Sequence, residues 1–249
     1  MRSLPRSPAI IRFVSSISPA GTPSELGAEE SINYEIGTRI AHKKWLRAET
    51  TGFLSNFRNQ IVTNTAATSS GQTEQVNGGP TRIVGIEGSS LLALGKLFAI
   101  ATDVDLGARY TFSRATFVGG PNGGLLLPYA PLHSFNASLD IEQPVAHGAG
   151  GLGGEIAYTH VSSQFADVAN TVDWDTTGRI GIMGPRNIVD LTAHYHHKPT
   201  GLTFRLTVKN AFDDVYVISR RPEGIFPSGF RQIVAGIRWT YEKVGGDGG

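Results

Sequence analysis

Residues 202–241 contain the most regular alternation of apolar and polar side chains in the sequence. In 202–210 the two alternating sets are Leu202, Phe204, Leu206 and Val208 against Thr203, Arg205, Thr207 and Lys209. The pattern resumes further along, with Ile233, Ala235, Ile237, Trp239 and Tyr241 on one side. Because successive side chains of a strand point to opposite faces, this period of two predicts two strands. A polar connection would join them into a long antiparallel hairpin.

The same period predicts seven more strands upstream of this hairpin. They cover residues 31–41, 46–61, 81–94, 98–112, 133–143, 153–165 and 187–197. Short turns are expected at 42–44, 148–151 and 199–201, and long polar loops at 62–79, 118–131 and 166–185. The sequence therefore predicts an all-β fold, an antiparallel meander of about nine strands.

Alternation alone does not say whether the sheet lies in water or in a membrane. In the 98–112 strand the apolar side would hold Phe98, Ile100, Val104, Leu106, Tyr110 and Phe112, and the other side Asp103, Asp105, Gly107, Arg109 and Thr111. Unpaired charges are costly in a dry core but not against a wet lumen. Trp239 and Tyr241 suit the aromatic girdle of a barrel. A transmembrane barrel is favoured, with a soluble β-sandwich binding module as the alternative.

Composition agrees with a barrel wall and excludes other classes. Only 17% of the 249 residues are charged, 40% are hydrophobic and 31 are glycine. The 22 Lys and Arg nearly balance the 21 Asp and Glu, which gives no indication of a nucleic-acid partner. Cysteine is absent, so disulfides and thiolate metal sites are excluded. No apolar run reaches 18 residues, which excludes a transmembrane helix but not barrel strands.

The C-terminal stretch carries a family resemblance. Residues 209–216, KNAFDDVY, are similar to the "KNLFD-x-x-Y" strand end of TonB-dependent outer-membrane receptors. Pro227, Gly229, Arg231, Gly236 and Trp239 follow the spacing of that family's last strand, and the run 219–225, SRRPEGI, resembles the ferric dicitrate and siderophore branch. Ala211 stands where leucine is usual, the final aromatic is Tyr241 rather than phenylalanine, and KVGGDGG follows it.

The resemblance extends from about residue 18 to residue 241 and implies a domain layout. Residues 1–30 are expected to form a leader or loop, with a secretory signal as the alternative, 31–242 the C-terminal portion of a receptor barrel, and 243–249 a disordered tail. The family's complete barrels have 22 strands around a plug. Nine strands would therefore be part of a barrel, with the plug domain absent from this sequence.

The resemblance also implies function and partners. It predicts a segment of an outer-membrane receptor for ferric-siderophore uptake, ferric citrate included, that is not transport-competent alone. The implied partners are outer-membrane lipid, the barrel-insertion machinery, the ferric chelate as cargo and, only if a plug is supplied, the energy-transducing inner-membrane complex. No resident cofactor is expected. The alternative is a truncated, non-transporting fragment with a structural or interaction role, whose open edges pair with another barrel piece.

Two arginines are the candidate ligand-binding residues. Arg220 and Arg221 fall in the last long loop, and a guanidinium fork suits citrate and other carboxylate-rich iron chelates. A solvated loop, or a salt bridge to Glu223, is the alternative interpretation.

Other polar clusters give weaker indications. His194, His196 and His197 could suggest a metal site, but lumenal or turn positions explain them better, since no third ligand is apparent. Asp103 and Asp105 have the spacing of same-face neighbours on a strand, which lumen-lining pairs share with catalytic carboxylates. Asp213 and Asp214 read as a strand-end turn, and GGPNGG at 119–124 as a loop tip. With no Ser/His/Asp or zinc pattern, an enzyme is not expected.

Overall fold

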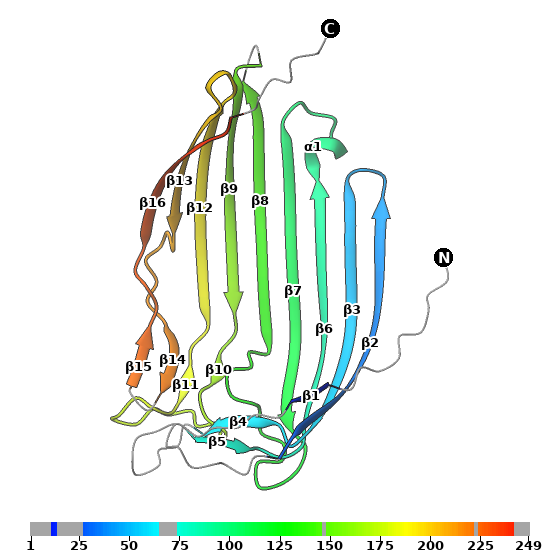
Figure 1. Cartoon of the computed structure of the whole chain (residues 1–249), viewed down its shortest axis with the longest axis vertical. Coiled ribbons are helices and arrows are strands. Elements are labelled where there is room, and N and C mark those ends of the chain that lie inside the picture. Colours follow the sequence, from blue (N-terminus) through cyan, green and yellow to red (C-terminus); the bar gives the residue numbers. More distant parts are fainter. Residues whose placement is uncertain (1–10, 14–26, 65–73, 146–147, 222–223, 242–249) are drawn as a thin grey trace.

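Ten antiparallel strands form one continuous, curved sheet in the computed structural model, which describes residues 11–13, 27–64, 74–145, 148–221 and 224–241 (Figure 1). In spatial order these strands are β1 (Ile11–Phe13), β2 (Glu29–His42), β3 (Leu46–Arg58), β6 (Thr81–Ala93), β7 (Asp103–Phe117), β8 (His133–Val145), β9 (Gly150–Val161), β12 (Arg186–His197), β13 (Leu202–Lys209) and β16 (Gln232–Trp239). Nine are long and follow one another as sequential neighbours. The predicted antiparallel meander of nine strands is confirmed.

Unbroken pairing fixes the register of this sheet. β2 and β3 pair without a shift from Glu30 opposite Arg58 to His42 opposite Leu46. The turn that joins them includes Lys43 at a φ of 50°, as tight hairpins require of one residue. Because no bulge interrupts the pairing of the nine long strands, the alternation in the sequence is carried across the whole sheet as two distinct faces.

The connections differ at the two ends of the sheet. Short turns join the strands at one end, including the 3-10 turn η2 (Lys198–Thr200), and long connections gather at the other (Figure 1). The long connections are not plain loops as predicted, because they hold three small hairpins: β4 (Ile61–Asn64) with β5 (Glu74–Asn77), β10 (Gln164–Phe165) with β11 (Ile182–Met183), and β14 (Val217–Arg221) with β15 (Gly224–Pro227).

The strand predicted at 98–112 starts later and ends later, because β7 spans Asp103–Phe117. Residues Leu94–Leu97 instead form the single helical turn α1, closed by the amide of Phe98 donating to the carbonyl of Leu94 at 2.9 Å. Phe98 and Ile100 were therefore wrongly assigned to a strand face. They lie in the turn, beside Ala99 with its φ of 53°, which breaks an extended backbone.

Strand β1 and the chain ends bear on the expected domain limits. β1 pairs with the start of β2, inside the stretch predicted as a leader, while residues 1–10 and 14–26 lie outside the described residues. The predicted tail, 243–249, lies outside them too.

The buried core is small and lies at the end of the long connections. Its centre is Ala115, Phe117 and Leu127, where the connection after β7 folds back over the sheet. Many large apolar side chains are instead exposed, such as Ile36 at 82% and Trp239 at 67%. Within the described part of the chain, no helix has the length and apolar character to cross a membrane. The sheet thus has an apolar face that no layer formed by the described residues covers.

Candidate functional site

The polar side chains of the strands lie together on one face of the sheet. Residues directly opposite each other in neighbouring strands point to the same side. One row of such partners crosses five strands: Arg39, Glu49, Ser89, Arg109 and Asn136. This face, here called the polar face, is the first candidate site.

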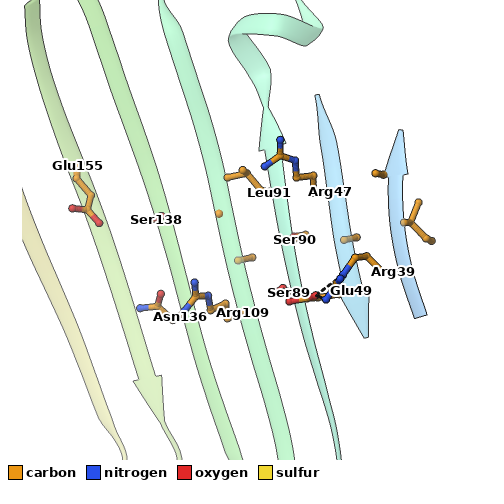
Figure 2. Close-up of a pocket in the computed structure, with 15 residues that line it drawn as sticks. Arg39, Arg47, Glu49, Ser89, Ser90, Leu91, Arg109, Asn136, Ser138 and Glu155 are labelled. Carbon is orange, nitrogen blue, oxygen red and sulfur yellow. Dashed lines mark hydrogen bonds and ion pairs between the residues drawn. The ribbon is translucent and has the colours of Figure 1, made fainter. Parts of the chain in front are cut away.

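An ion pair lies near the middle of the polar face. Arg39 Nη2 is 3.0 Å from Glu49 Oε2, and Ser89 Oγ donates to the other carboxylate oxygen at 3.2 Å (Figure 2). The side chains of Arg39 and Glu49 are 83% and 51% exposed, and pairs this open to water contribute only about 0–1 kcal/mol. The pair therefore contributes little to the stability of the sheet, and its charged groups are accessible to a ligand.

A hollow of about 680 Å³ surrounds this pair. Small residues such as Gly107 and Ser138 leave room in its lining, and Arg47, Arg109 and Glu155 project around it (Figure 2). The guanidinium groups of Arg47 and Arg109 make no hydrogen bond or ion pair with any residue that the structure describes, although Arg109 is close enough to Glu49 to interact with it electrostatically. Two open guanidinium groups in a concave wall suit carboxylate or phosphate oxygens.

Carboxylates face one another on the same polar face, nearer to the short turns. Asp103 lies opposite Glu142 and Asp105 opposite Asp140. Asp103 and Asp105 share a face, as predicted. Like charges directly across a strand pair repel, and a dry interior would magnify the cost. Two such pairs side by side indicate that this face is hydrated, which argues against the sandwich alternative.

His194 and His196 share the polar face, as the alternation predicts, whereas His197 points the other way. His194 Nε2 lies 2.8 Å from Glu142 Oε1, two strands away. The carboxylate reaches across β9 because residue 153 is glycine: a Cβ there would lie 2.4 Å from the Glu142 oxygens. His196 and His197 contact Thr203 and Thr200. Among the described residues, no group of three or more His, Cys, Asp and Glu is placed to hold a metal ion.

The predicted ligand-binding pair lies in β14, at the end of the long connections. Arg220 is only 4% exposed. Its Nη1 donates to the carbonyl of Gly178 at 2.9 Å and its Nη2 to that of Ile182 at 3.4 Å, and its Cζ lies 5.8 Å from the centre of the Trp174 ring. Arg220 thus holds the 166–185 connection in place. The side chain of Arg221, like Glu223, lies outside the described residues.

A tyrosine links a third connection to Arg220. The Tyr129 hydroxyl donates to the backbone carbonyl of Arg220 and accepts from its amide at 3.2 Å. Three long connections, far apart in sequence, are therefore fastened around Arg220. We refer to Tyr129, Asp167, Asn170, Gly178 and Arg220 with their contacts as the loop clasp.

Asp167 and Asn170 of the loop clasp were missed by the sequence reasoning. Asp167 is 3% exposed and its carboxylate accepts from the amides of Ala169, Thr171 and Gly181 and from the Thr171 hydroxyl. Asn170 bonds both backbone groups of Leu126, at 2.7 and 2.8 Å. The spacing D-x-A-x-T was the available signal, since aspartate commonly bonds amides two residues on.

Asn210 shows why the "KN" stretch is structurally demanding. Asn210 has a φ of 51°. Its side chain accepts from the backbone amide of Asp214 at 3.1 Å and donates to the Asp214 carbonyl at 2.9 Å. Its backbone amide donates to Asp190 Oδ1 at 2.8 Å. Asparagine tolerates this left-handed backbone and closes the turn with its amide. The predicted strand-end turn at Asp213 and Asp214 follows from it.

Comparison with known proteins agrees with this architecture. The sequence profile described as "TonB dependent receptor-like, beta-barrel" matches residues 6–211. The solved structure of the ferric citrate transporter FecA, unliganded, is 28% identical, with a TM-score of 0.67, over 83% of this chain and 30% of that one. BauA, the ferric preacinetobactin receptor of Acinetobacter baumannii, is 15% identical, with a TM-score of 0.67, over 92% of this chain and 32% of that one. FyuA, the ferric yersiniabactin uptake receptor of Yersinia pestis, is 18% identical, with a TM-score of 0.61, over 89% of this chain and 30% of that one.

Fold and profile together define a class, that of transmembrane β-barrels with a hydrated lumen. The chain belongs to the TonB-dependent receptor β-barrel family, whose members are outer-membrane receptors. It spans about a third of the length of the structures it matches. The apolar face of the sheet is therefore the lipid-facing side and the polar face the lumenal side.

Proposed function

We propose that this chain forms part of the wall and loops of an outer-membrane receptor that takes up a ferric chelate rich in carboxylates, with ferric citrate the first candidate. The match to the ferric citrate transporter carries the proposal, at 28% identity over 83% of the chain. The open guanidinium groups of Arg47 and Arg109 support it, because they suit carboxylates on the path that cargo would take.

The loop clasp refines the role of the predicted arginine pair. Arg220 donates to two backbone carbonyls and supports ligand binding indirectly, by fixing the connections that face the cell exterior. Arg221, its neighbour in β14, remains the candidate for direct contact with the chelate.

Transport would require more than this chain provides. Among the residues that the structure describes, β16 pairs with β13 alone, and β1 covers β2 only at Glu29, Glu30 and Ser31. Unpaired edges of this kind are completed by other strands in a closed barrel. We propose that the chain acts within a larger barrel in the outer membrane, assembled by the barrel-insertion machinery, with energy coupling supplied through a plug domain.

A ligand-binding assay tests the proposal. The complete receptor that carries this segment, purified in detergent, is expected to retain ⁵⁵Fe-citrate on a filter. The chain expressed by itself is expected in the outer-membrane fraction without supporting ⁵⁵Fe uptake. Gallium citrate should compete, because it has the same charge and ligand geometry.

The outcomes separate uptake from the alternative, a non-transporting fragment with a structural or interaction role. The two open edges of the sheet are the observation that favours this alternative. Retention of a catecholate chelate but not of citrate would overturn the assigned ligand and keep the receptor function. If the purified receptor retained no ferric chelate, the structural role would be favoured instead.

A further inference from the structure

On the lipid-facing side of the nine long strands, as far as the structure describes them, arginines lie at one end of the sheet only. Arg58, Arg82 and Arg114 occupy positions of the same parity as the exposed apolar residues of β3, β6 and β7. All three lie at the end where the long connections gather, because β3 and β7 finish there and β6 begins there (Figure 1). Their guanidinium groups are exposed.

Arg82 and Arg114 are close neighbours in this group. Arg82 lies opposite Thr116 and Arg114 opposite Val84, so the two arginines are diagonal partners on adjacent strands, with Cα atoms roughly 7–8 Å apart. Arg82 Nε donates to Asn56 Oδ1 at 2.9 Å. The side chain of Arg114 makes no hydrogen bond or ion pair with any described residue. Two guanidinium groups at this separation can share one phosphate.

The described strands supply almost no negative charge on this side. Of the acidic residues within the nine long strands that the structure describes, Glu30 is the one on the lipid-facing side, opposite Arg58. The others, including Glu49, Glu87 and Glu155, belong to the lumenal side. Arg82 and Arg114 are thus left without a carboxylate from their own sheet face.

Arg82 and Arg114 lie at the level along the strands where lipid headgroups are expected. In β7 the lipid-facing positions from Val104 to Phe112 are apolar or aromatic, and this nine-residue length is close to the roughly 9–11 residues that a tilted strand needs to cross the hydrocarbon. Arg114 is the next lipid-facing position after Phe112, and Arg82 precedes Val84 by the same step. Tyr110, whose hydroxyl lies 2.8 Å from His133 Nδ1, is the lipid-facing residue before Phe112, so the apolar band ends in aromatic side chains next to Arg114.

We propose that Arg82 and Arg114 form a binding site for the phosphate of a lipid headgroup in the leaflet at the long-connection end. A phosphate group accepts paired hydrogen bonds from guanidinium groups. A lipid headgroup holds its phosphate next to the apolar band, whereas a soluble anion has no anchor there. The site lies in the middle of the sheet, on the fourth and fifth of ten strands, away from both open edges. It is independent of which chelate the receptor takes up.

The test measures lipid retained by the chain in detergent. Protein folded in dodecylmaltoside is incubated with short-chain phosphatidic acid or with phosphatidylcholine, and bound lipid is counted by native mass spectrometry. The double variant R82Q/R114Q is expected to hold roughly tenfold less phosphatidic acid, as the loss of charge-assisted bonds predicts. The double variant R205Q/R238Q removes the same charge from the lumenal side and is expected to leave binding unchanged.

Three results would overturn the site. Equal losses in both double variants would show unspecific charge attraction. Unchanged binding in R82Q/R114Q would remove these arginines from lipid binding. Displacement of the lipid by an equal concentration of inorganic phosphate would make the ligand a free anion. Should R82Q/R114Q lose the β-sheet circular dichroism of the parent, Arg114→Gln alone decides, because that side chain bonds no described residue: weaker binding supports the site and equal binding refutes it.

Discussion

The polar face of the sheet, called the wall below, and the loop clasp are both rich in polar side chains, but they are stabilised by different interactions. On the wall, Arg39 and Glu49 are exposed and their ion pair is open to water. In the loop clasp, Arg220 and Asp167 are buried and each satisfies several backbone groups. The wall owes its stability to backbone ladders, so its side chains are free for binding. The clasp owes its shape to single side chains, so substitutions there are expected to cost most.

The largest effect is expected for Arg220→Ala. Removing the guanidinium leaves the carbonyls of Gly178 and Ile182 without their donor in a buried site, at a cost of about 2–4 kcal/mol in the free energy of loop opening. Limited proteolysis of the folded protein should therefore cut the 166–185 connection much faster. Arg220→Lys serves as a matched variant that keeps the charge and loses the fork. Unchanged cleavage in the alanine variant would show that the clasp does not depend on Arg220.

Asp167→Ala should open the same connection by a smaller amount, about 1–3 kcal/mol, because three amides and a hydroxyl lose one acceptor. Hydrogen exchange at the amides of Ala169 and Thr171 reports it directly. Asp173→Ala, a neighbouring exposed position, is the control. Equal protection in Asp167→Ala and the parent would rule out this aspartate as the centre of the connection.

Arg39→Ala on the polar face is expected to lower the free energy of unfolding, measured by urea titration, by less than about 1 kcal/mol, and by less still at high salt. Glu49→Gln should behave alike, since each variant removes the same pair. A loss comparable with that of Arg220→Ala would contradict the contrast between wall and clasp.

The smallest effect concerns Asp175, in the connection after β10. The Thr177 hydroxyl donates to Asp175 Oδ2 at 2.7 Å and, with the amides of Arg179, Gly178 and Thr177, lowers the pKa of this carboxyl. A lowered pKa in the folded state stabilises the turn above the ordinary aspartate pKa, and this contribution is lost as the pH falls through the folded value. Thr177→Val is expected to raise the pKa, as carboxyl ¹³C NMR titration would show. An unaltered titration would exclude the hydroxyl as the cause.

The two regions also differ in what the sequence could predict. Nine strands and both faces followed from a period of two, because every other side chain meets the same surroundings. Asp103 and Asp105 could be placed on the hydrated face for the same reason. The delayed start of β7 could not be predicted, because the positive φ of Ala99 depends on the packing of α1 and not on residue type.

Within the candidate site, alternation was enough to place the polar residues of the strands, whereas the surroundings of Arg220 depend on tertiary contacts. Arg220 lies in a loop-rich segment that composition marks as exposed, yet it is buried against Gly178 and Trp174, some 40 residues earlier. The links from Tyr129 and Asn170 join connections separated along the chain. Such pairings carry no local signal, since neither partner's sequence neighbourhood specifies the other.

The exposed apolar face has a consequence for how this wall accepts change. In a soluble core, trimming Leu206 or Ile237 to alanine would leave a void, and that void accounts for much of the damage. Fluid acyl chains fill such a gap, so these outward positions should tolerate exchange among aliphatic residues while rejecting charge. Substitutions should therefore accumulate mainly at positions that face lipid. Gly153, which lies beneath the Glu142 carboxylate, should accept them less readily, because a Cβ there would overlap the carboxylate oxygens.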